Sequence, residues 1–308
     1  MRILVTGAGG QLGSAVSKIA KGVEIISLDA HALDITNSHE IEDRFDEVAP
    51  DVVLNAAAYT AVDRAESDTD RAMQVNGHAV QLLAAACKRH GAKLVHVSTD
   101  FIFDGTASSP IATSETPSPR SVYGHTKLAG ELACNEELAT NQALIVRTAW
   151  VYAAGHPNFV TTMLGLMNSR DQVRIVADQI GTPTWAVTLA GTTLDLISKG
   201  ASGVFHVTDS GVASWFDFAV AIYELGRENG LIRNDVEIVP ILSSAYATAA
   251  ERPKYSVLDK TSSYEILGKA MVSFNRSKVL LSKIENVFFV IFQKNHEKLY
   301  CGLLCIFI

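Results

Sequence analysis

The first thirteen residues constrain the fold more than any other part of the chain. Residues 1–6 form a short, largely apolar stretch that predicts a strand, and it runs into a turn with glycines at positions 7, 10 and 13. The small and apolar residues from Leu12 to Ile19 then predict a helix. Glycine lets the backbone turn sharply and approach a phosphate, and N–H groups at a helix N-terminus bind anions. This order of strand, glycine turn and helix predicts a dinucleotide-binding unit.

Strands and helices alternate without interruption through the first half of the chain. Apolar runs bounded by turn-forming residues predict four further strands, with helical segments between them. These strands are expected at residues 23–28, 51–55, 93–97 and 143–147, and a long helix rich in Ala and Leu is expected at residues 70–90. Because such alternation requires crossover connections, the predicted class is α/β with a doubly wound parallel sheet.

The chain is long enough for one large α/β unit with an added lobe. We expect a dinucleotide-binding domain in residues 1–150. From about residue 151 the pattern loosens into shorter helices and strands. This change predicts a smaller, mixed α/β lobe in residues 151–270 that holds the substrate, with part of it free to return to the main sheet. Residues 271–308 read as a separate, atypical tail.

Composition narrows the class of partner and the compartment. Hydrophobic residues make up 48% of the chain and charged residues 19%, a profile typical of soluble globular proteins. The net charge of −7 argues against nucleic acid as a partner, because no basic excess is present to neutralise phosphates. We also expect no signal peptide and no membrane span. The four cysteines lack disulfide or metal spacing, which favours a reducing, cytoplasmic location.

Several polar or small residues lie where predicted strands end. Asp29 follows the second strand, sixteen residues after Gly13, and is expected to meet the ribose hydroxyls of the dinucleotide. The alternative is a surface aspartate that caps the next turn. Alanines 56–58 follow the third strand and permit close approach of a flat ligand, although packing alone would also explain them. Ser98-Thr99-Asp100 ends the fourth strand, at the edge where ligands bind in such sheets.

Tyr123 and Lys127 form a candidate acid/base pair. They lie four residues apart on a predicted helix, so they point the same way. A free phenol titrates near about 10, and a neighbouring ammonium favours its ionised form. We therefore expect Lys127 to lower the pKa of Tyr123, while Thr99 hydrogen-bonds a substrate carbonyl or hydroxyl. A tyrosine and lysine at this spacing are a weak signal alone, but here they follow the glycine turn and Thr99 in order.

Eight short segments between Met1 and about Gly268 carry a family resemblance. They are Gly-Gln-Leu-Gly (10–13), Asn-Ala-Ala-Ala-Tyr-Thr-Ala-Val-Asp (55–63), Val-Ser-Thr-Asp-Phe-Ile-Phe-Asp-Gly (97–105), Val-Tyr-Gly-His-Thr-Lys-Leu-Ala-Gly-Glu (122–131), Arg-Thr-Ala-Trp-Val-Tyr (147–152), Asn-Phe-Val-Thr-Thr-Met (158–163), Asp-Gln-Ile-Gly-Thr-Pro-Thr (178–184) and Arg-Pro (252–253). Together they resemble the extended short-chain dehydrogenases/reductases, and more narrowly the dTDP-4-dehydrorhamnose reductase family. The resemblance implies a Rossmann sheet and hydride transfer from NADPH or NADH to carbon 4 of a nucleotide sugar.

The resemblance also implies a role for each candidate residue. Tyr123 would donate a proton, Lys127 would bind the nicotinamide ribose, and Thr99 would orient the carbonyl. The expected cofactor-binding residues are Gly7, Gly10, Gln11, Leu12, Asp29, Asp34, Ile35, Ala56, Ala57, Tyr59, Tyr123 and Lys127. The expected substrate-binding residues are Thr99, Asp100, Trp150, Asn158 and Phe159. From the residues alone, Trp150 and Phe159 would be read as core aromatics.

The sequence departs from the family pattern in places. Asp29 favours NADH because its carboxylate repels a 2′-phosphate. The family that the sequence resembles often accepts NADPH, so the preferred nicotinamide cofactor stays open. Some family members use magnesium at a subunit interface; a homodimer is compatible with the sequence, but no carboxylate cluster here calls for a metal. From about Met271 the expected final helix is missing, and the last 38 residues contain five Phe and two of the four Cys. A shifted reading frame would explain such a tail.

Two alternative functions remain open at this stage. Another nucleotide-sugar epimerase or reductase would share the glycine turn and the Tyr123–Lys127 pair. A non-catalytic, NADP-binding regulatory subunit would be expected to have lost that pair, and this chain retains both residues.

Overall fold

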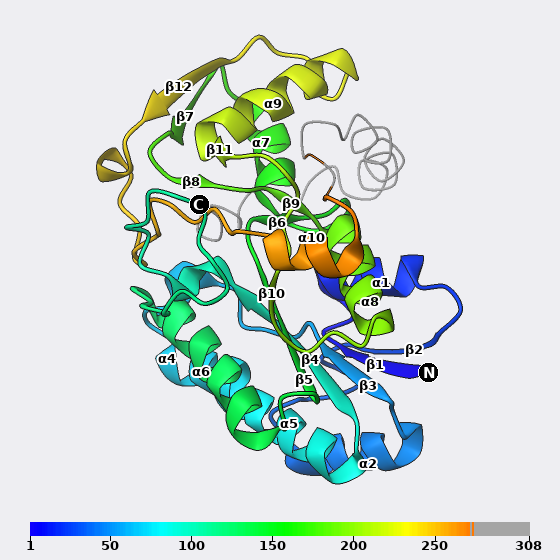
Figure 1. The fold of residues 1–308 in the computed structure, drawn as a ribbon. Helices are drawn as coiled ribbons and strands as arrows, with labels where there is room; N and C mark the ends of the chain where they lie inside the picture. Colours follow the sequence, from blue (N-terminus) through cyan, green and yellow to red (C-terminus); the bar gives the residue numbers. More distant parts are fainter. Residues whose placement is uncertain (272, 274–308) are drawn as a thin grey trace.

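A six-stranded parallel sheet forms the centre of the molecule in the computed structural model, which describes residues 1–271 and 273 (Figure 1). The strand order is β2-β1-β3-β4-β5-β10, and all neighbours pair in parallel. The bounds are β1 (Arg2–Thr6), β2 (Glu24–Leu28), β3 (Val52–Asn55), β4 (Lys93–Thr99), β5 (Ala143–Thr148) and β10 (Gly203–His206). The predicted doubly wound α/β sheet is confirmed.

Helices cover both faces of the sheet, which explains why its central strands are apolar on both sides (Figure 1). Along β1, Leu4 packs on one face, whereas Ile3 and Val5 pack on the other. The first face is covered by α2 (Ser38–Val48), α5 (Ala79–His90) and α6 (Val122–Glu137). The second is covered by α1 (Gln11–Ile19), α8 (Ala186–Ser198) and α10 (Thr261–Leu267).

The helix predicted over residues 70–90 contains a π-helical turn. It starts as α4 (Thr69–Met73), continues through the π turn η1 (Gln74–His78) and ends as α5. Periodicity alone cannot reveal one extra residue in a turn, so the sequence predicted a plain helix. The π turn contains the buried Asn76, whose Nδ2 donates to the Tyr59 carbonyl and to Thr126 Oγ1 on α6. Such turns are frequent at functional sites.

A smaller lobe lies above one end of the sheet (Figure 1). Its core is rich in aromatic side chains and is built by the segments α7 (Phe159–Met167), β7 (Gln172–Val176), α9 (Trp215–Glu228) and β12 (Glu237–Ile241). Asn158 and Ser214 start the two helices with reciprocal capping hydrogen bonds. Between these elements the chain returns to the main sheet, because β10 pairs with β5 at its edge.

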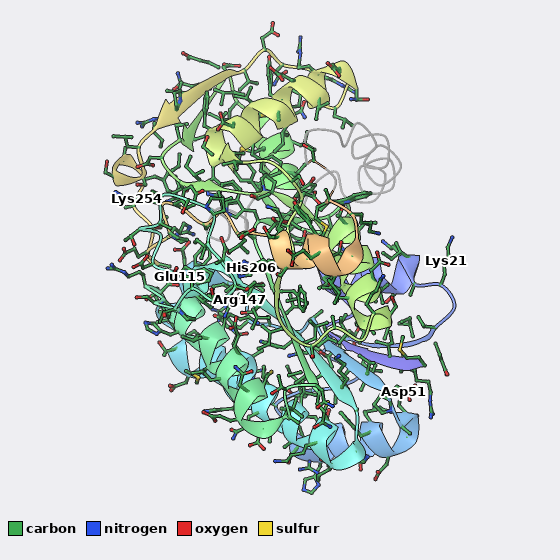
Figure 2. All side chains as sticks on the ribbon, in the orientation of Figure 1. Lys21, Asp51, Glu115, Arg147, His206 and Lys254 are labelled. Atoms are coloured by element: carbon green, nitrogen blue, oxygen red, sulfur yellow. The ribbon has the colours of Figure 1, made fainter. Side chains whose placement is uncertain are left out.

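A buried ion pair joins α6 to the sheet. Arg147 of β5 donates to the Glu131 carboxylate at 3.0 and 2.7 Å and to the Thr113 carbonyl at 3.2 Å. Both charged side chains are about 5% exposed. Figure 2 shows Arg147 near His206, the last residue of β10, in the middle of the molecule. The pair therefore fixes α6 against the carboxyl end of β5.

The atypical tail falls almost wholly outside the described residues, including Cys301 and Cys305. Met271, at its start, is buried, and its carbonyl accepts a hydrogen bond from Ser210 Oγ at 2.8 Å. Cys87 and Cys134 are free thiols buried between α5 and α6. Among the described residues no helix is both long and apolar enough to cross a membrane.

Candidate active site

The glycine turn lies where the strand order reverses, between β1 and β3. Gly7 has φ +66°, and a Cβ there would lie 2.6 Å from the Cα of Ala57, which follows β3. A Cβ on Gly13 would lie 2.4 Å from the Gly7 carbonyl oxygen. Side chains at these two positions would push the turn away from both β3 and α1. Ligands bind at this reversal point in open α/β sheets.

The N-terminus of α1 is suited to bind an anion. Gly10 is its N-cap residue, and no side chain caps the helix. The first N–H groups of a helix have no partner within it, and here they begin at Gln11 and Leu12. The open helix end and the close glycine packing fit the pyrophosphate of a dinucleotide. The structure therefore brings together the four residues predicted for this part of the site.

Asp29 directly follows β2 and lies beside the glycine turn. A Cβ on Gly9 would lie 3.6 Å from the Asp29 Cβ. Asp29 is exposed, and its Oδ1 accepts hydrogen bonds from the N–H groups of His31 and Ala32, both at 3.0 Å. Asp29 thus caps the next turn, as the alternative interpretation expected. This role is compatible with binding a ribose hydroxyl, because both turn hydrogen bonds go to Oδ1 and the side chain is exposed.

Asp34 stabilises the loop after β2, and Ile35 packs in the hydrophobic core. Asp34 Oδ1 accepts from the backbone N–H and the hydroxyl of Thr36, and these bonds hold the pKa of Asp34 below its usual value. Ile35 is buried in the core under α2 and α5. Their contact with a cofactor therefore stays a prediction.

The residues after β3 line the other side of the reversal point. Ala56 and Ala57 are partly exposed, and Ala57 N–H donates to Asn55 Oδ1 at 3.2 Å. Tyr59 is anchored twice: its N–H donates to Asn76 Oδ1, and its hydroxyl donates to Asp68 Oδ2 at 3.0 Å. Burial, followed by the Asp68 contact, raises the pKa of Tyr59. This part of the site therefore consists of small alanine side chains beside Tyr59, which is held by hydrogen bonds.

Tyr123 and Thr99 meet at the carboxyl end of β4. The Tyr123 phenol is hydrogen-bonded to Thr99, whose Oγ1 donates to Asp100 Oδ1 at 3.0 Å. Ser121 caps α6, and a Cβ on Gly124 would lie 2.3 Å from the Phe101 carbonyl oxygen. The glycine after Tyr123 therefore lets α6 approach the strand end closely enough for this contact.

The electrostatics of the pair differ from the sequence-based expectation. Burial raises the pKa of Tyr123 to about 12, and nearby Asp100 adds to the shift. The predicted lowering by Lys127 is wrong for this structure, because Lys127 Nζ donates to the Val97 carbonyl at 2.7 Å and lies 3.4 Å from His96 Nε2. Burial also lowers the pKa of Lys127 to about 8. A protonated phenol is the form that can give a proton to a reduced carbonyl.

Asp100 is more deeply buried than the sequence suggested. It is 1% exposed, it is hydrogen-bonded to Thr99 and Ser256, and its Oδ2 has no partner. Burial raises its pKa to about 6. A carboxyl group this deeply buried presents no oxygen to a ligand in this structure, so direct contact of Asp100 with the substrate stays a prediction.

Trp150 and Phe159 form one aromatic wall in the smaller lobe. Trp150 stacks on Trp215 with ring centroids 3.5 Å apart and planes 4° from parallel, and Phe159 contacts the same Trp215 at 4.7 Å. Trp150 has φ +47°, a backbone conformation that is strained for a bulky residue. Its ring packs on Gly181, where a Cβ would lie 2.6 Å away. Such an imposed conformation supports a functional position for Trp150.

Asn158 links the lobe to the glycine turn. Its Nδ2 donates to the carbonyl oxygens of Ala153 and His156 and to Gln11 Oε1, while its Oδ1 accepts from Thr161 N–H. Asn158 is buried, and these contacts occupy its side-chain amide. Its role in this structure is to brace the loop before α7. Direct contact with the sugar stays a prediction.

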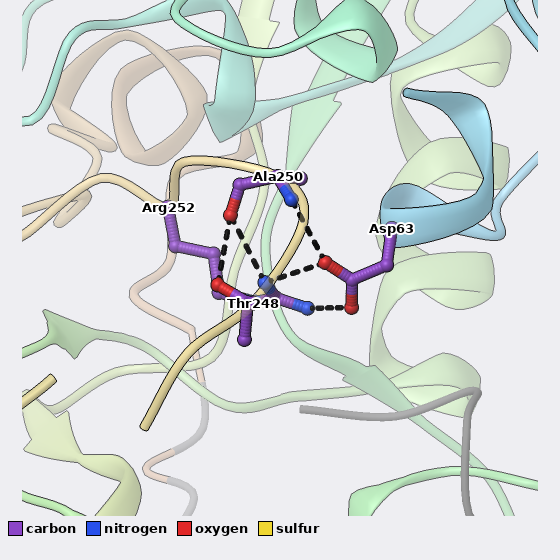
Figure 3. A network of polar contacts seen from close by, with 4 residues as sticks. All are labelled: Asp63, Thr248, Ala250 and Arg252. Atoms are coloured by element: carbon purple, nitrogen blue, oxygen red, sulfur yellow. Dashed lines mark hydrogen bonds and ion pairs between the residues drawn. The ribbon is translucent and has the colours of Figure 1, made fainter. Parts of the chain in front are cut away.

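Asp63 and Arg252 are motif residues to which the sequence analysis assigned no role, and the fold pairs them with each other. Figure 3 shows Arg252 in a two-pronged ion pair with Asp63, at 3.0 and 2.7 Å, and Ala250 N–H donates to the same carboxylate. Thr248 Oγ1 donates to the Ala250 carbonyl. These contacts hold the loop of residues 248–252 against α3 (Val62–Ala65), the short helix that follows β3. Only the long-range fold brings them together.

A cavity of about 600 Å³ opens between this loop and the segment that follows β4, which contributes residues 104–106 and Arg120. Its lining includes Arg120, Gln179, Ser243, Tyr246 and Lys254. Among residues 1–271 and 273, no group of three or more His, Cys, Asp or Glu side chains could hold a metal ion.

The reversal-point turn, the parallel sheet and the Thr99–Tyr123–Lys127 arrangement define an extended short-chain dehydrogenase/reductase. A family model described as RmlD substrate binding domain matches residues 1–282. The dTDP-4-dehydrorhamnose reductase of Burkholderia thailandensis is 43% identical over 280 residues, covering 87% of this chain and 93% of that protein. The chain therefore belongs to the dTDP-4-dehydrorhamnose reductase family.

Solved structures agree with this assignment. A dTDP-4-dehydrorhamnose reductase from Clostridium acetobutylicum has a TM-score of 0.86 at 40% identity, covering 92% of this chain and all of that one. The Bacillus anthracis enzyme, solved in complex with NADP, has a TM-score of 0.84 at 33% identity, covering 94% of this chain and 99% of that one. The family-model match extends past Gly268, where the sequence resemblance was expected to end.

Proposed function

We propose that this protein reduces dTDP-4-dehydro-β-L-rhamnose to dTDP-L-rhamnose with NADPH or NADH, in the biosynthesis of cell-surface polysaccharide. The observation that carries the proposal is the buried Tyr123–Thr99 contact beside Lys127, at the strand ends next to the glycine turn. Family membership supports the substrate, and the NADP complex of the Bacillus anthracis relative supports the cofactor. We also propose that the protein is cytoplasmic and forms a homodimer.

The chain's residues divide the work of the reaction. The nicotinamide cofactor supplies the hydride. Thr99 orients the carbonyl group, and Tyr123 donates its phenolic proton to the oxygen as negative charge develops there. Lys127 binds the nicotinamide ribose, within reach of the same strand end. Asp100 accepts from Thr99 Oγ1 and so holds that hydroxyl in place.

The two ends of the site hold the rest of the ligands. Gly7, Gly10, Gln11 and Leu12 bind the pyrophosphate of the cofactor, Asp29 its ribose, and Trp150 with Phe159 lines the sugar pocket. The 600 Å³ cavity supports binding of the dTDP part of the substrate, because exposed Arg120 and Lys254 lie on its lining.

The test is oxidation of NADPH and of NADH by purified protein, with the substrate generated in situ and the product identified. Stoichiometric cofactor consumption with dTDP-rhamnose formation is expected. An epimerase would interconvert sugars without net consumption, and a regulatory subunit would bind cofactor without turnover. Reduction of dTDP-4-keto-6-deoxy-D-glucose alone would instead support the activity named for a Streptomyces niveus relative.

Substitution of Gly13 by alanine is expected to weaken dinucleotide binding at least about tenfold. The new methyl group would meet the Gly7 carbonyl oxygen at 2.4 Å and force the turn to shift. Cofactor fluorescence titration measures the change. Gly9→Ala is the matched control, because a Cβ there meets only the Asp29 Cβ at 3.6 Å. Equal affinities for the two variants would contradict the role given to Gly13.

Substitution of Asp29 by alanine is expected to shift cofactor preference towards NADPH by about tenfold in kcat/KM. The carboxylate repels a 2′-phosphate and accepts hydrogen bonds from ribose hydroxyls, so its loss helps one cofactor and harms the other. Kinetics with both cofactors measure the ratio. Asp46→Ala, which removes an exposed carboxylate from α2, should leave the ratio unchanged. If Asp29→Ala also leaves the ratio of kcat/KM for the two cofactors unchanged, the role given to Asp29 is contradicted.

A further inference from the structure

His96 is a polar side chain in the fully buried middle of β4, and none of the proposed chemistry uses it. It has no solvent exposure, and its strand neighbours Val95 and Val97 are apolar. Burial of an imidazole is costly unless its nitrogens are paired. The hydrogen-bond partners of His96 therefore indicate the role of this histidine in the strand.

Asn55 determines which His96 nitrogen carries the hydrogen. Asn55 Oδ1 accepts from Thr6 Oγ1 at 2.6 Å and from Ala57 N–H at 3.2 Å, which fixes the orientation of the amide. Its Nδ2 consequently faces His96 Nδ1 at 3.2 Å. An amide nitrogen only donates, so Nδ1 of His96 accepts. A neutral imidazole then carries its hydrogen on Nε2.

The other side of the imidazole faces Lys127. His96 Nε2 lies 3.4 Å from Lys127 Nζ, which donates to the Val97 carbonyl at 2.7 Å. Burial, followed by the Lys127 charge, holds the pKa of His96 well below its usual value, so the ring is neutral. A Cβ on Gly130 would lie 3.0 Å from Nε2, so this glycine makes room for the ring.

We propose that His96 is a positioning residue for Lys127: the chain Thr6–Asn55–His96 presents an N–H to the lysine amine, holds it at the Val97 carbonyl and opposes its protonation. This inference rests on the proposed role of Lys127 in the reductase. The other groups that act on Lys127 are Glu131 and Cys134 from its own helix, and both favour the ammonium. Arg147 neutralises the Glu131 carboxylate.

Two substitutions separate this role from packing. His96→Gln can offer a carbonyl oxygen to Asn55 and an N–H to Lys127, whereas His96→Phe keeps a ring but offers neither. At pH 8.5, where burial leaves much of Lys127 as the amine by lowering its pKa to about 8, the phenylalanine variant is expected to lose about tenfold or more in kcat, because this amine is no longer held in place. The glutamine variant should retain several-fold more turnover than the phenylalanine variant. A role in packing alone predicts the reverse order.

The pH profile of kcat/KM gives a second readout, because it reports the ionisations of the free enzyme. The limb near pH 8 assigned to Lys127 should move to higher pH in His96→Phe, where the opposing N–H is gone, and should stay in place in His96→Gln. Thermal unfolding of both variants identifies any loss of folded protein. Identical pH limbs in the wild type and the folded phenylalanine variant would overturn the proposal.

Nitrogen NMR of histidine-labelled wild-type protein tests the tautomer without turnover. The expected spectrum shows His96, assigned from the glutamine variant, as a neutral imidazole with its hydrogen on Nε2 from about pH 5.5 to 8.5. A hydrogen on Nδ1, or titration with an ordinary histidine pKa, would overturn the proposal. If no variant and no wild-type sample reduced the sugar, the proposed function would fail while this spectrum still decided the arrangement of His96.

Discussion

Replacement of Tyr123 by phenylalanine is expected to lower turnover by about 10²–10⁴-fold while dinucleotide binding persists. The phenol is hydrogen-bonded to Thr99, and burial keeps it protonated at neutral pH by raising its pKa to about 12. Loss of one hydroxyl removes this donor but leaves the ring, its edge-on contact with Phe101 at 5.5 Å and the start of α6. The defect should therefore appear in kcat and not in the fold.

Steady-state kinetics and cofactor titration of the same sample measure this prediction. Tyr264→Phe is the matched control, because it removes a tyrosine hydroxyl that contacts Ser210 on the opposite side of the sheet. That control should turn over at nearly the wild-type rate. Normal turnover by the Tyr123 variant would remove Tyr123 from the mechanism.

Replacement of Arg147 by methionine is expected to lower the free energy of unfolding by about 3–5 kcal/mol. The substitution leaves the Glu131 carboxylate, which is 4% exposed, without its cationic partner. It also removes the bond to the Thr113 carbonyl and the cation–π contact with Phe103 at 5.4 Å. Urea unfolding at neutral pH measures the change.

An exposed ion pair provides the control for this measurement. Arg44 pairs with Glu47 on α2, where the two side chains are 39% and 65% exposed, so Arg44→Met should cost less than about 1 kcal/mol. The double variant Arg147→Met/Glu131→Leu should recover much of the lost stability, because it no longer buries an unpaired charge. An Arg147→Met variant as stable as Arg44→Met would show that the buried pair does not brace α6.

The parts of the fold that follow from local pattern were predictable. Continuous apolar runs marked the strands, and the glycines at 7, 10 and 13 marked the turn, where Gly7 and Gly13 leave no room for a Cβ. Tyr123 and Lys127 share a helix face, and Thr99 ends the neighbouring strand. Topology then brings these groups to one edge of the sheet.

The interactions that depend on long-range packing were not predictable. The π turn around Asn76 changes the helix by a single residue, which hydrophobic periodicity does not detect. His96 has the same apolar surroundings in the sequence as a valine would have, and its partners Asn55 and Lys127 lie 41 and 31 residues away. The pKa of Tyr123 depends on burial and on the direction of Lys127 Nζ. The positions of the two residues on one helix therefore did not suffice to predict whether this pKa is raised or lowered.

The most direct test of the central claim is transfer of deuterium from cofactor labelled at carbon 4 of the nicotinamide. The product made from dTDP-4-dehydro-β-L-rhamnose should be dTDP-L-rhamnose with one deuterium on carbon 4 of the sugar, detected by mass spectrometry and proton NMR. Tyr123→Phe should form the same labelled product far more slowly. Folded, cofactor-binding protein that leaves carbon 4 unlabelled would contradict hydride transfer by this site.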